Sequence, residues 1–236
     1  MDGFLYKDLR QAKIYFLVLL ICQAIVAVLQ FFFAAIMGAS DPALTVMIGS
    51  IFCLLIFMIV NMFNKTLCAT DERRGWLYFA VSTPDGAKRQ VKSKFTIHFL
   101  MDLMVLIFNF FIDTICVGIC GQESSYIVVA FTLFCFYLMI GAIELPFAFR
   151  YGTEKGGKVK VIALIVILGS ILLYGLFGDI SFLLGENPWE ALKRLFKTGV
   201  MIWVLALLPY VSCMVFYFCY RISLKVYTKG VDSYEK

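Results

Sequence analysis

Six long apolar runs dominate the chain and are separated by polar segments. The runs are Ile14–Met37, Leu44–Phe63, Phe95–Cys120, Tyr126–Phe149, Val159–Phe177 and Gly199–Ile222. Each is long enough, or nearly so, to cross a hydrocarbon core of about 30 Å as a helix that rises about 1.5 Å per residue. A helix is predicted because a backbone inside a bilayer must satisfy its own hydrogen bonds. The pattern therefore predicts an all-α, polytopic membrane protein with six transmembrane helices, built as one domain over residues 1–236.

The Lys and Arg residues are distributed unevenly among the segments between these runs. Of the 21 in the chain, all but Lys193, Arg194 and Lys197 lie on the side that carries both termini. Cytoplasmic segments are enriched in Lys and Arg, so both termini are predicted to be cytoplasmic. The net charge of +5 is spread along one membrane face, which disfavours binding to nucleic acid.

The usual signatures of enzymes and metal sites are missing from the sequence. There is no phosphate-binding G-x-x-x-x-G-K-[ST] loop, no H-E-x-x-H zinc motif and no G-x-S-x-G nucleophile motif. The eight cysteines have no C-x-x-C spacing and fall mostly within or at the ends of the apolar runs. They are expected to be small packing residues. We therefore expect no catalytic residue, no metal site and no cofactor bound by this chain.

Polar residues follow one face of the third apolar run. His98, Asp102, Asn109 and Asp113 share this face because successive residues of a helix are about 100° apart. An Asp near the bilayer centre costs about 2.5–3.5 kcal/mol, so the face must point at protein or water. Two interpretations stay open. Asp102, Asn109 and Asp113 line a translocation pathway, or they fix the packing of helices through hydrogen bonds and ion pairs.

Two short amphipathic helices are predicted outside the apolar runs. One covers residues 2–13 on the cytoplasmic surface, with apolar positions at helical spacing at Phe4, Leu5, Leu9 and Ala12. The other covers residues 187–198 in the outer interface. Asn187 is its predicted N-cap, and the residues that share its apolar face are Trp189, Leu192 and Phe196.

The segment 64–94 is the longest predicted cytoplasmic connection. Within it, Thr70 is a candidate N-cap, and Asp71 and Glu72 suit the N-terminus of a helix because of its dipole. Trp76 and Phe79 then lie about one turn apart on one side. The sequence predicts a short helix over Thr70–Phe79 that presents aromatic side chains to the cytoplasm, which favours a docking surface.

This segment resembles the loop after the second span in bacterial type II ATP-binding-cassette exporter permeases. The likeness is strongest to the small six-span family that includes exporters of phenol-soluble modulins. The matching features, in order, are an acidic pair, a Trp, a Ser/Thr-Pro and a Lys at the start of the third span, here Asp71-Glu72, Trp76, Thr83-Pro84 and Lys94. The opening Phe4–Leu9 also looks like that family's opening. The chain departs from the pattern at Arg73-Arg74-Gly75.

The resemblance implies a partner ATPase that binds ATP and Mg²⁺, and a second copy of this chain in the same transporter. It implies that the predicted helix over Thr70–Phe79 is a coupling helix, the segment through which a permease contacts its ATPase. The residues at this contact would be Thr70, Asp71, Glu72, Arg73, Arg74, Trp76 and Phe79. The helix over residues 2–13 would be the elbow, and Trp189, Leu192 and Phe196 would help to close the outer gate. The cargo would be an amphipathic peptide or a hydrophobic compound, exported across the bacterial plasma membrane, and lipid would surround the spans. Two rival interpretations are a six-span substrate-binding component of an importer and an intramembrane enzyme.

Overall fold

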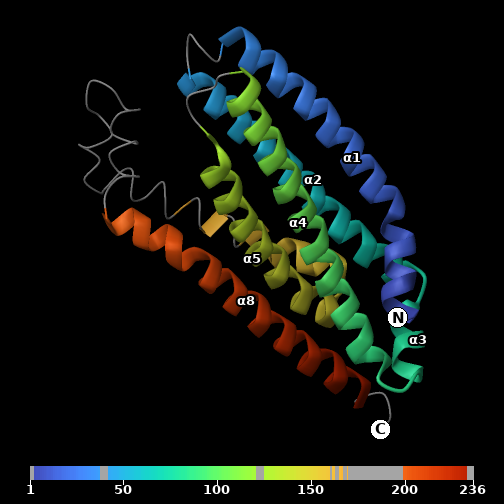
Figure 1. The fold of residues 1–236 in the computed structure, drawn as a ribbon. Helices are drawn as coiled ribbons and strands as arrows, with labels where there is room; N and C mark the ends of the chain where they lie inside the picture. Colours follow the sequence, from blue (N-terminus) through green and yellow to red (C-terminus); the bar gives the residue numbers. More distant parts are fainter. Residues whose placement is uncertain are drawn as a thin grey trace.

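A computed structural model describes residues 3–37, 42–120, 125–159, 161–162, 165–166, 169 and 199–232. The described residues form helices and no strands (Figure 1). The helices are α1 (Gly3–Met37), α2 (Pro42–Arg73), α3 (Trp76–Ser82), α4 (Gly86–Cys120), α5 (Ile127–Tyr151) and α8 (Gly199–Asp232). Residues 153–159 are also helical and follow α5 directly.

Five of these helices, α1, α2, α4, α5 and α8, are long and apolar enough to cross a membrane. The prediction of an all-helical membrane protein is therefore confirmed for the described residues. The predicted span at Val159–Phe177 falls largely outside them, and so does the predicted outer helix over residues 187–198. The count of six spans stays a prediction.

The helices extend beyond the apolar runs that predict them. The separate elbow helix over residues 2–13 is not seen, because α1 continues without a break from Gly3 to Met37. No Gly or Pro lies between Lys7 and Met37 to interrupt it. Likewise, α2 continues past Phe63 to Arg73 and α4 already begins at Gly86. Much of the predicted loop 64–94 is therefore helix.

The helices pack side by side, with α1 and α8 on opposite sides of the bundle (Figure 1). α1 packs against α2 and α4, and α8 packs against α5 and α4. Buried residues such as Leu19, Phe57 and Val105 fill the core between α1, α2 and α4. Large apolar side chains on the outer faces, such as Val28 on α1 and Trp203 on α8, are exposed. Exposed apolar surface of this extent suits contact with lipid.

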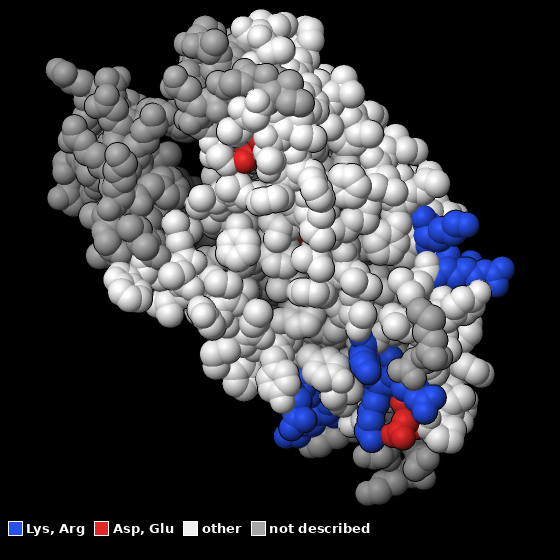
Figure 2. All heavy atoms as spheres, in the orientation of Figure 1, with Lys and Arg blue, Asp and Glu red and all other residues white. Residues whose placement is uncertain are grey.

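Charged side chains gather at one end of the bundle. We call this the basic end, and it comprises the start of α1, the end of α2, α3, the start of α4 and the end of α8 (Figures 1 and 2). Figure 2 shows Lys and Arg side chains over this end and over the first turns of α1, and no Lys or Arg over the white surface of the rest of that face, where only small areas of Asp or Glu are visible. This arrangement matches the uneven distribution of positive charge along the sequence.

Candidate functional site

The connection from α2 to α3 differs from the predicted single helix over Thr70–Phe79. α2 ends at Arg73, and Gly75 has a positive φ of 67° before α3 begins at Trp76. A left-handed residue after a helix stops it, and glycine adopts that conformation without steric cost. The Thr70 hydroxyl donates to the Thr66 carbonyl inside α2, so Thr70 is not the predicted N-cap.

A second tight turn joins α3 to α4. The Gly86 amide donates a hydrogen bond to the Thr83 carbonyl at 2.9 Å, which closes the turn over Pro84 and Asp85. Pro at the second position and a positive φ of 54° at Asp85 are features of a type II turn. The Lys88 ammonium donates to the Asp85 carboxylate at 2.9 Å, and this bond lowers the pKa of Asp85. α3 is therefore a short helix held between two spans by two tight turns.

Two cations and two carboxylates form a buried cluster at the basic end. We call Lys7, Asp8, Asp71 and Lys94 the ion-pair cluster. Lys7 Nζ lies 2.8 Å from Asp8 and 2.7 Å from Asp71, while Lys94 Nζ lies 3.2 Å from Asp8 and 2.5 Å from Asp71. The Ser93 hydroxyl also donates to Asp8 at 2.6 Å. The cluster therefore ties α1, α2 and α4 together at one point.

The cluster is stable only as a complete set. Asp8, Asp71 and Lys94 are all buried, and each buried ion costs several kcal/mol of desolvation unless it is paired and hydrogen-bonded. The cluster contains two cations and two carboxylates, so each buried ion has an oppositely charged partner. The sequence motif identified Asp71 and Lys94, and the structure brings them together. Sequence reasoning missed Lys7 and Asp8, although Asp8 shares a helical face with the buried Ala12 and Leu19.

The ion-pair cluster also positions α3. Lys7 Nζ lies 4.5 Å from the centre of the Trp76 ring, close enough for a cation–π interaction. Trp76 packs edge-on against Phe79, and Phe79 lies 6.2 Å from Phe4 of α1 between ring centres. A groove of about 540 Å³ runs between the start of α1 and α3 along these aromatic residues. Lys7 is thus shared between the cluster and the aromatic side of α3.

The outer side of α3 remains available for contact. Tyr78 is 79% exposed and Phe79 is 52% exposed, and Trp76 is only partly buried. Arg73 and Arg74 are exposed at the end of α2, beside the turn that leads to α3. Aromatic and Arg side chains together are typical of the central residues of protein interfaces.

Glu72 has a different role from its neighbour Asp71. Its carboxylate accepts hydrogen bonds from the Thr153 amide at 2.9 Å and from the Thr153 hydroxyl at 2.6 Å. Thr153 is the first residue of the helical stretch 153–159, so Glu72 satisfies a free amide at a helix N-terminus. The acidic pair of the motif therefore connects the end of α2 to two different parts of the chain.

The polar residues of the third span are all buried inside one copy of the chain. Asp113 accepts hydrogen bonds from the Ser125 hydroxyl and, at 3.1 Å, from the Tyr126 amide at the start of α5. Asn109 donates to the Val105 carbonyl, and Asp102 lies 3.4 Å from His98 Nδ1. These contacts favour the packing interpretation. A role of Asp102, Asn109 and Asp113 in lining a pathway stays an untested prediction.

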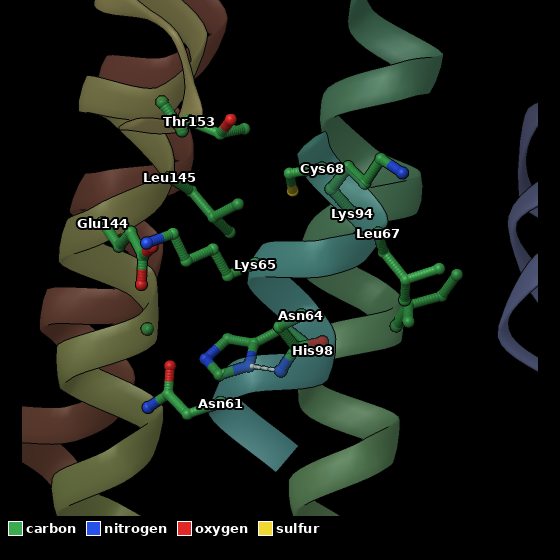
Figure 3. Close-up of a pocket in the computed structure, with 13 residues that line it drawn as sticks. Asn61, Asn64, Lys65, Leu67, Cys68, Lys94, His98, Glu144, Leu145 and Thr153 are labelled. Carbon is green, nitrogen blue, oxygen red and sulfur yellow. Dashed lines mark hydrogen bonds between the residues drawn. The ribbon is translucent and has the colours of Figure 1, made fainter. Parts of the chain in front are cut away.

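A small cavity lined by both polar and apolar side chains lies between α2, α4 and α5, close to the ion-pair cluster (Figure 3). Its volume of about 20 Å³ is enough for one water molecule. His98 lies on the wall of this cavity. Its Nδ1 atom is 2.7 Å from the Asn64 side-chain nitrogen, and its Nε2 atom is 3.4 Å from the Leu138 carbonyl oxygen. Gly141 allows this approach, because a Cβ there would lie 2.3 Å from the His98 ring. The cavity is too small for an exported molecule.

Two further predictions concern an outer gate and metal ions. Trp189, Leu192 and Phe196 lie outside the described residues. Among the residues that are described, no group of three or more His, Cys, Asp or Glu side chains could hold a metal ion.

Comparison with known protein families gives one match. A family described as ABC-2 family transporter protein matches residues 3–228. No curated protein and no solved structure matches the chain significantly. The matched region runs from the start of α1 through most of α8, so it includes the ion-pair cluster and α3.

Proposed function

This chain belongs to the ABC-2 family of transporter proteins, and we propose that it is the permease of an exporter driven by ATP hydrolysis on a separate subunit. Membrane components of this family are generally non-catalytic and work with an ATPase. The chain is accordingly a multi-pass membrane component of an ABC transporter. In our proposal ATP and Mg²⁺ bind to the partner, and this chain binds no cofactor.

The observation that carries the proposal is the fixed position of α3. The helix is short, exposes aromatic side chains and is joined directly to α2 and α4 by tight turns. A segment that only connected two spans would not need an aromatic surface or a Lys7 contact to α1. We propose that α3 is the coupling helix, with Trp76 and Phe79 as its anchors and with Arg73 and Arg74 at its edge.

The ion-pair cluster supplies a route for force. A displacement of α3 by the ATPase would act on the adjoining ends of α2 and α4 through the two turns. It would act on α1 through Lys7, which contacts both Trp76 and Asp71. Buried packing and ion pairs transmit such displacements because they have few alternative arrangements. In this scheme ATP binding re-packs the spans, and Glu72 carries the movement to residues 153–159.

We place both termini and α3 in the cytoplasm, because Lys and Arg gather at the basic end. Labelling with a membrane-impermeant thiol reagent tests this orientation. In a chain whose own cysteines are replaced by serine, Asp85→Cys should react only after the cells are opened. Glu123→Cys, in the predicted outer connection, is the control that should react in intact cells. Reaction of Asp85→Cys in intact cells would contradict the orientation.

The remaining parts of the proposal concern assembly and cargo. Two copies of the chain would enclose a central path across a bacterial plasma membrane, each copy would bind one ATPase, and lipid would contact the outer faces. Trp189, Leu192 and Phe196 would lie at the outer end of this path. The cargo would be an amphipathic peptide, as in the phenol-soluble-modulin exporters, or a hydrophobic compound. The aromatic-rich spans, in a chain with 24 Phe and 12 Tyr, suit cargo of either kind.

Purification from the native membrane tests the function itself. We expect an ATP-binding-cassette ATPase to co-elute with the tagged chain in mild detergent, and the eluate to hydrolyse ATP. A matched preparation from cells that lack the ATPase should bind no transport substrate tightly. The importer alternative predicts the opposite result, namely substrate binding by the isolated chain and no associated ATPase.

A further inference from the structure

A second groove at the basic end lies on the opposite side of the bundle from α1. It is formed by the first turn of α4 and the last turns of α8, and its volume is about 380 Å³. Its lining combines positive charge with apolar surface, supplied by Lys88, Arg221, Lys225, Phe218, Ile222 and Leu224. Among the described lining residues, none is acidic.

The walls of this groove are held together by contacts on its inner side. Tyr227 of α8 donates to Gln90 of α4 at 2.9 Å, and both residues are buried. Phe95 of α4 packs edge-on against Phe216 and Tyr220 of α8. The inner face of α8 thus packs against α4. Arg221 and Lys225, which are four residues apart, lie on the exposed side of α8.

The positive charge in the groove is only partly neutralised. Lys88 is paired with Asp85 at 2.9 Å, and both side chains are largely exposed. None of the ion pairs among the described residues involves Arg221 or Lys225. These two cations therefore lie beside exposed apolar residues, Phe218 and Ile222, at the end of a membrane-spanning helix.

We propose that this groove binds an anionic phospholipid, with its phosphate between Arg221, Lys225 and Lys88. An acyl chain would lie along Phe218 and Ile222, which continue into the exposed apolar face of α8 at Met214 and Val211. Charge complementarity and this continuous apolar track together identify the occupant. A soluble anion has no acyl chain to contact the apolar residues of the track. A zwitterionic lipid has no net negative charge, so the cations attract it less strongly. Basic pockets between spans on the cytoplasmic side suit anionic headgroups.

Lipid titration of the purified full-length chain tests the proposal. The midpoint of thermal unfolding in detergent is measured as phosphatidylglycerol or phosphatidylcholine is added, with native mass spectrometry to count bound lipid. Phosphatidylglycerol should raise the midpoint more than phosphatidylcholine does. The double variant Arg221→Gln/Lys225→Gln should weaken the apparent affinity for phosphatidylglycerol by about 30-fold, from two lost charges.

Two matched variants separate a lipid site from general effects. Lys155→Gln/Lys158→Gln removes two exposed cations from residues 153–159 and should keep the full response to phosphatidylglycerol. Arg221→Lys/Lys225→Arg keeps both positive charges and should keep most of the response to phosphatidylglycerol. This result would show that substitution at these two positions does not by itself remove the response. An equal response to both lipids would overturn the proposal. So would an equal effect of inorganic phosphate, or a change in oligomeric state in Arg221→Gln/Lys225→Gln, which would indicate a second copy in the groove.

Discussion

Replacing Asp71 with alanine is expected to destabilise the folded chain by about 3–5 kcal/mol, the usual cost of removing one partner from a buried ion pair. The loss leaves Lys7 and Lys94 to share the single carboxylate of Asp8. The charge of Lys94 loses the most stabilisation, because Lys94 is buried and the contact that it loses, 2.5 Å to Asp71, is the shorter of its two. The measurement is the unfolding free energy in detergent, obtained by denaturant titration.

A matched control and a rescue make this prediction specific. Glu154→Ala removes the acid from the exposed pair of Lys158 and Glu154, and should cost about 0.5 kcal/mol or less. Asp71→Asn combined with Lys94→Met removes one charge of each sign and should recover part of the loss in Asp71→Asn alone. Equal costs for Asp71→Ala and Glu154→Ala would show that the ion-pair cluster contributes little to stability.

Replacing Trp76 with alanine is expected to weaken association with the ATPase by about 30-fold or more, since a buried aromatic anchor contributes about 2 kcal/mol or more. Trp76 contacts Lys7 and Phe79 within the chain, so its loss alters both the surface of α3 and the support beneath it. Association is measured by titrating the purified ATPase onto the chain in nanodiscs, with stimulated ATP hydrolysis as a second readout.

Two further variants separate the surface from its support. Tyr78→Ala removes a side chain that is 79% exposed, so it should weaken association while leaving the unfolding midpoint unchanged. Trp203→Ala removes an exposed Trp from the apolar face of α8 and should leave association unchanged. Undiminished association in both Trp76→Ala and Tyr78→Ala would remove α3 from the docking surface.

Five of the six predicted spans match long apolar helices of the structure, because hydropathy reports which helices are apolar enough to lie in lipid. It does not report where a helix ends. α2 continues from Phe63 to Arg73 because nothing in Asn64–Arg73 opposes a helix, and the stop is set by the left-handed Gly75. The predicted helix over Thr70–Phe79 failed for this reason. Its acidic residues suit a helix N-terminus, but the N-terminus that Glu72 caps belongs to residues 153–159.

The candidate site was predictable in part. A motif places Asp71, Trp76 and Lys94 in order, but spacing along the sequence does not reveal which charges meet. Asp8 is 86 residues away from Lys94, and no local pattern connects them. The stripe at Asp102, Asn109 and Asp113 was correctly expected to avoid lipid, since all three are buried. Its partners were not predictable, because Asp113 accepts a hydrogen bond from Tyr126 at the start of α5, and hydropathy does not report which polar groups of two neighbouring spans meet.

The continuity of α1 has a mechanical consequence. The unbroken helix from Gly3 to Met37 is about 50 Å long along its axis at 1.5 Å per residue, which exceeds the thickness of the hydrocarbon core. Its first turns contact Trp76 and the ion-pair cluster, and its last turns reach the opposite end of the bundle. A tilt of about 5° around the cluster would therefore move Met37 by about 4 Å. A continuous helix of this kind would carry a small rotation at the cluster to the opposite end of the bundle, whereas a break between residues 2–13 and the span would confine that rotation to the first turns.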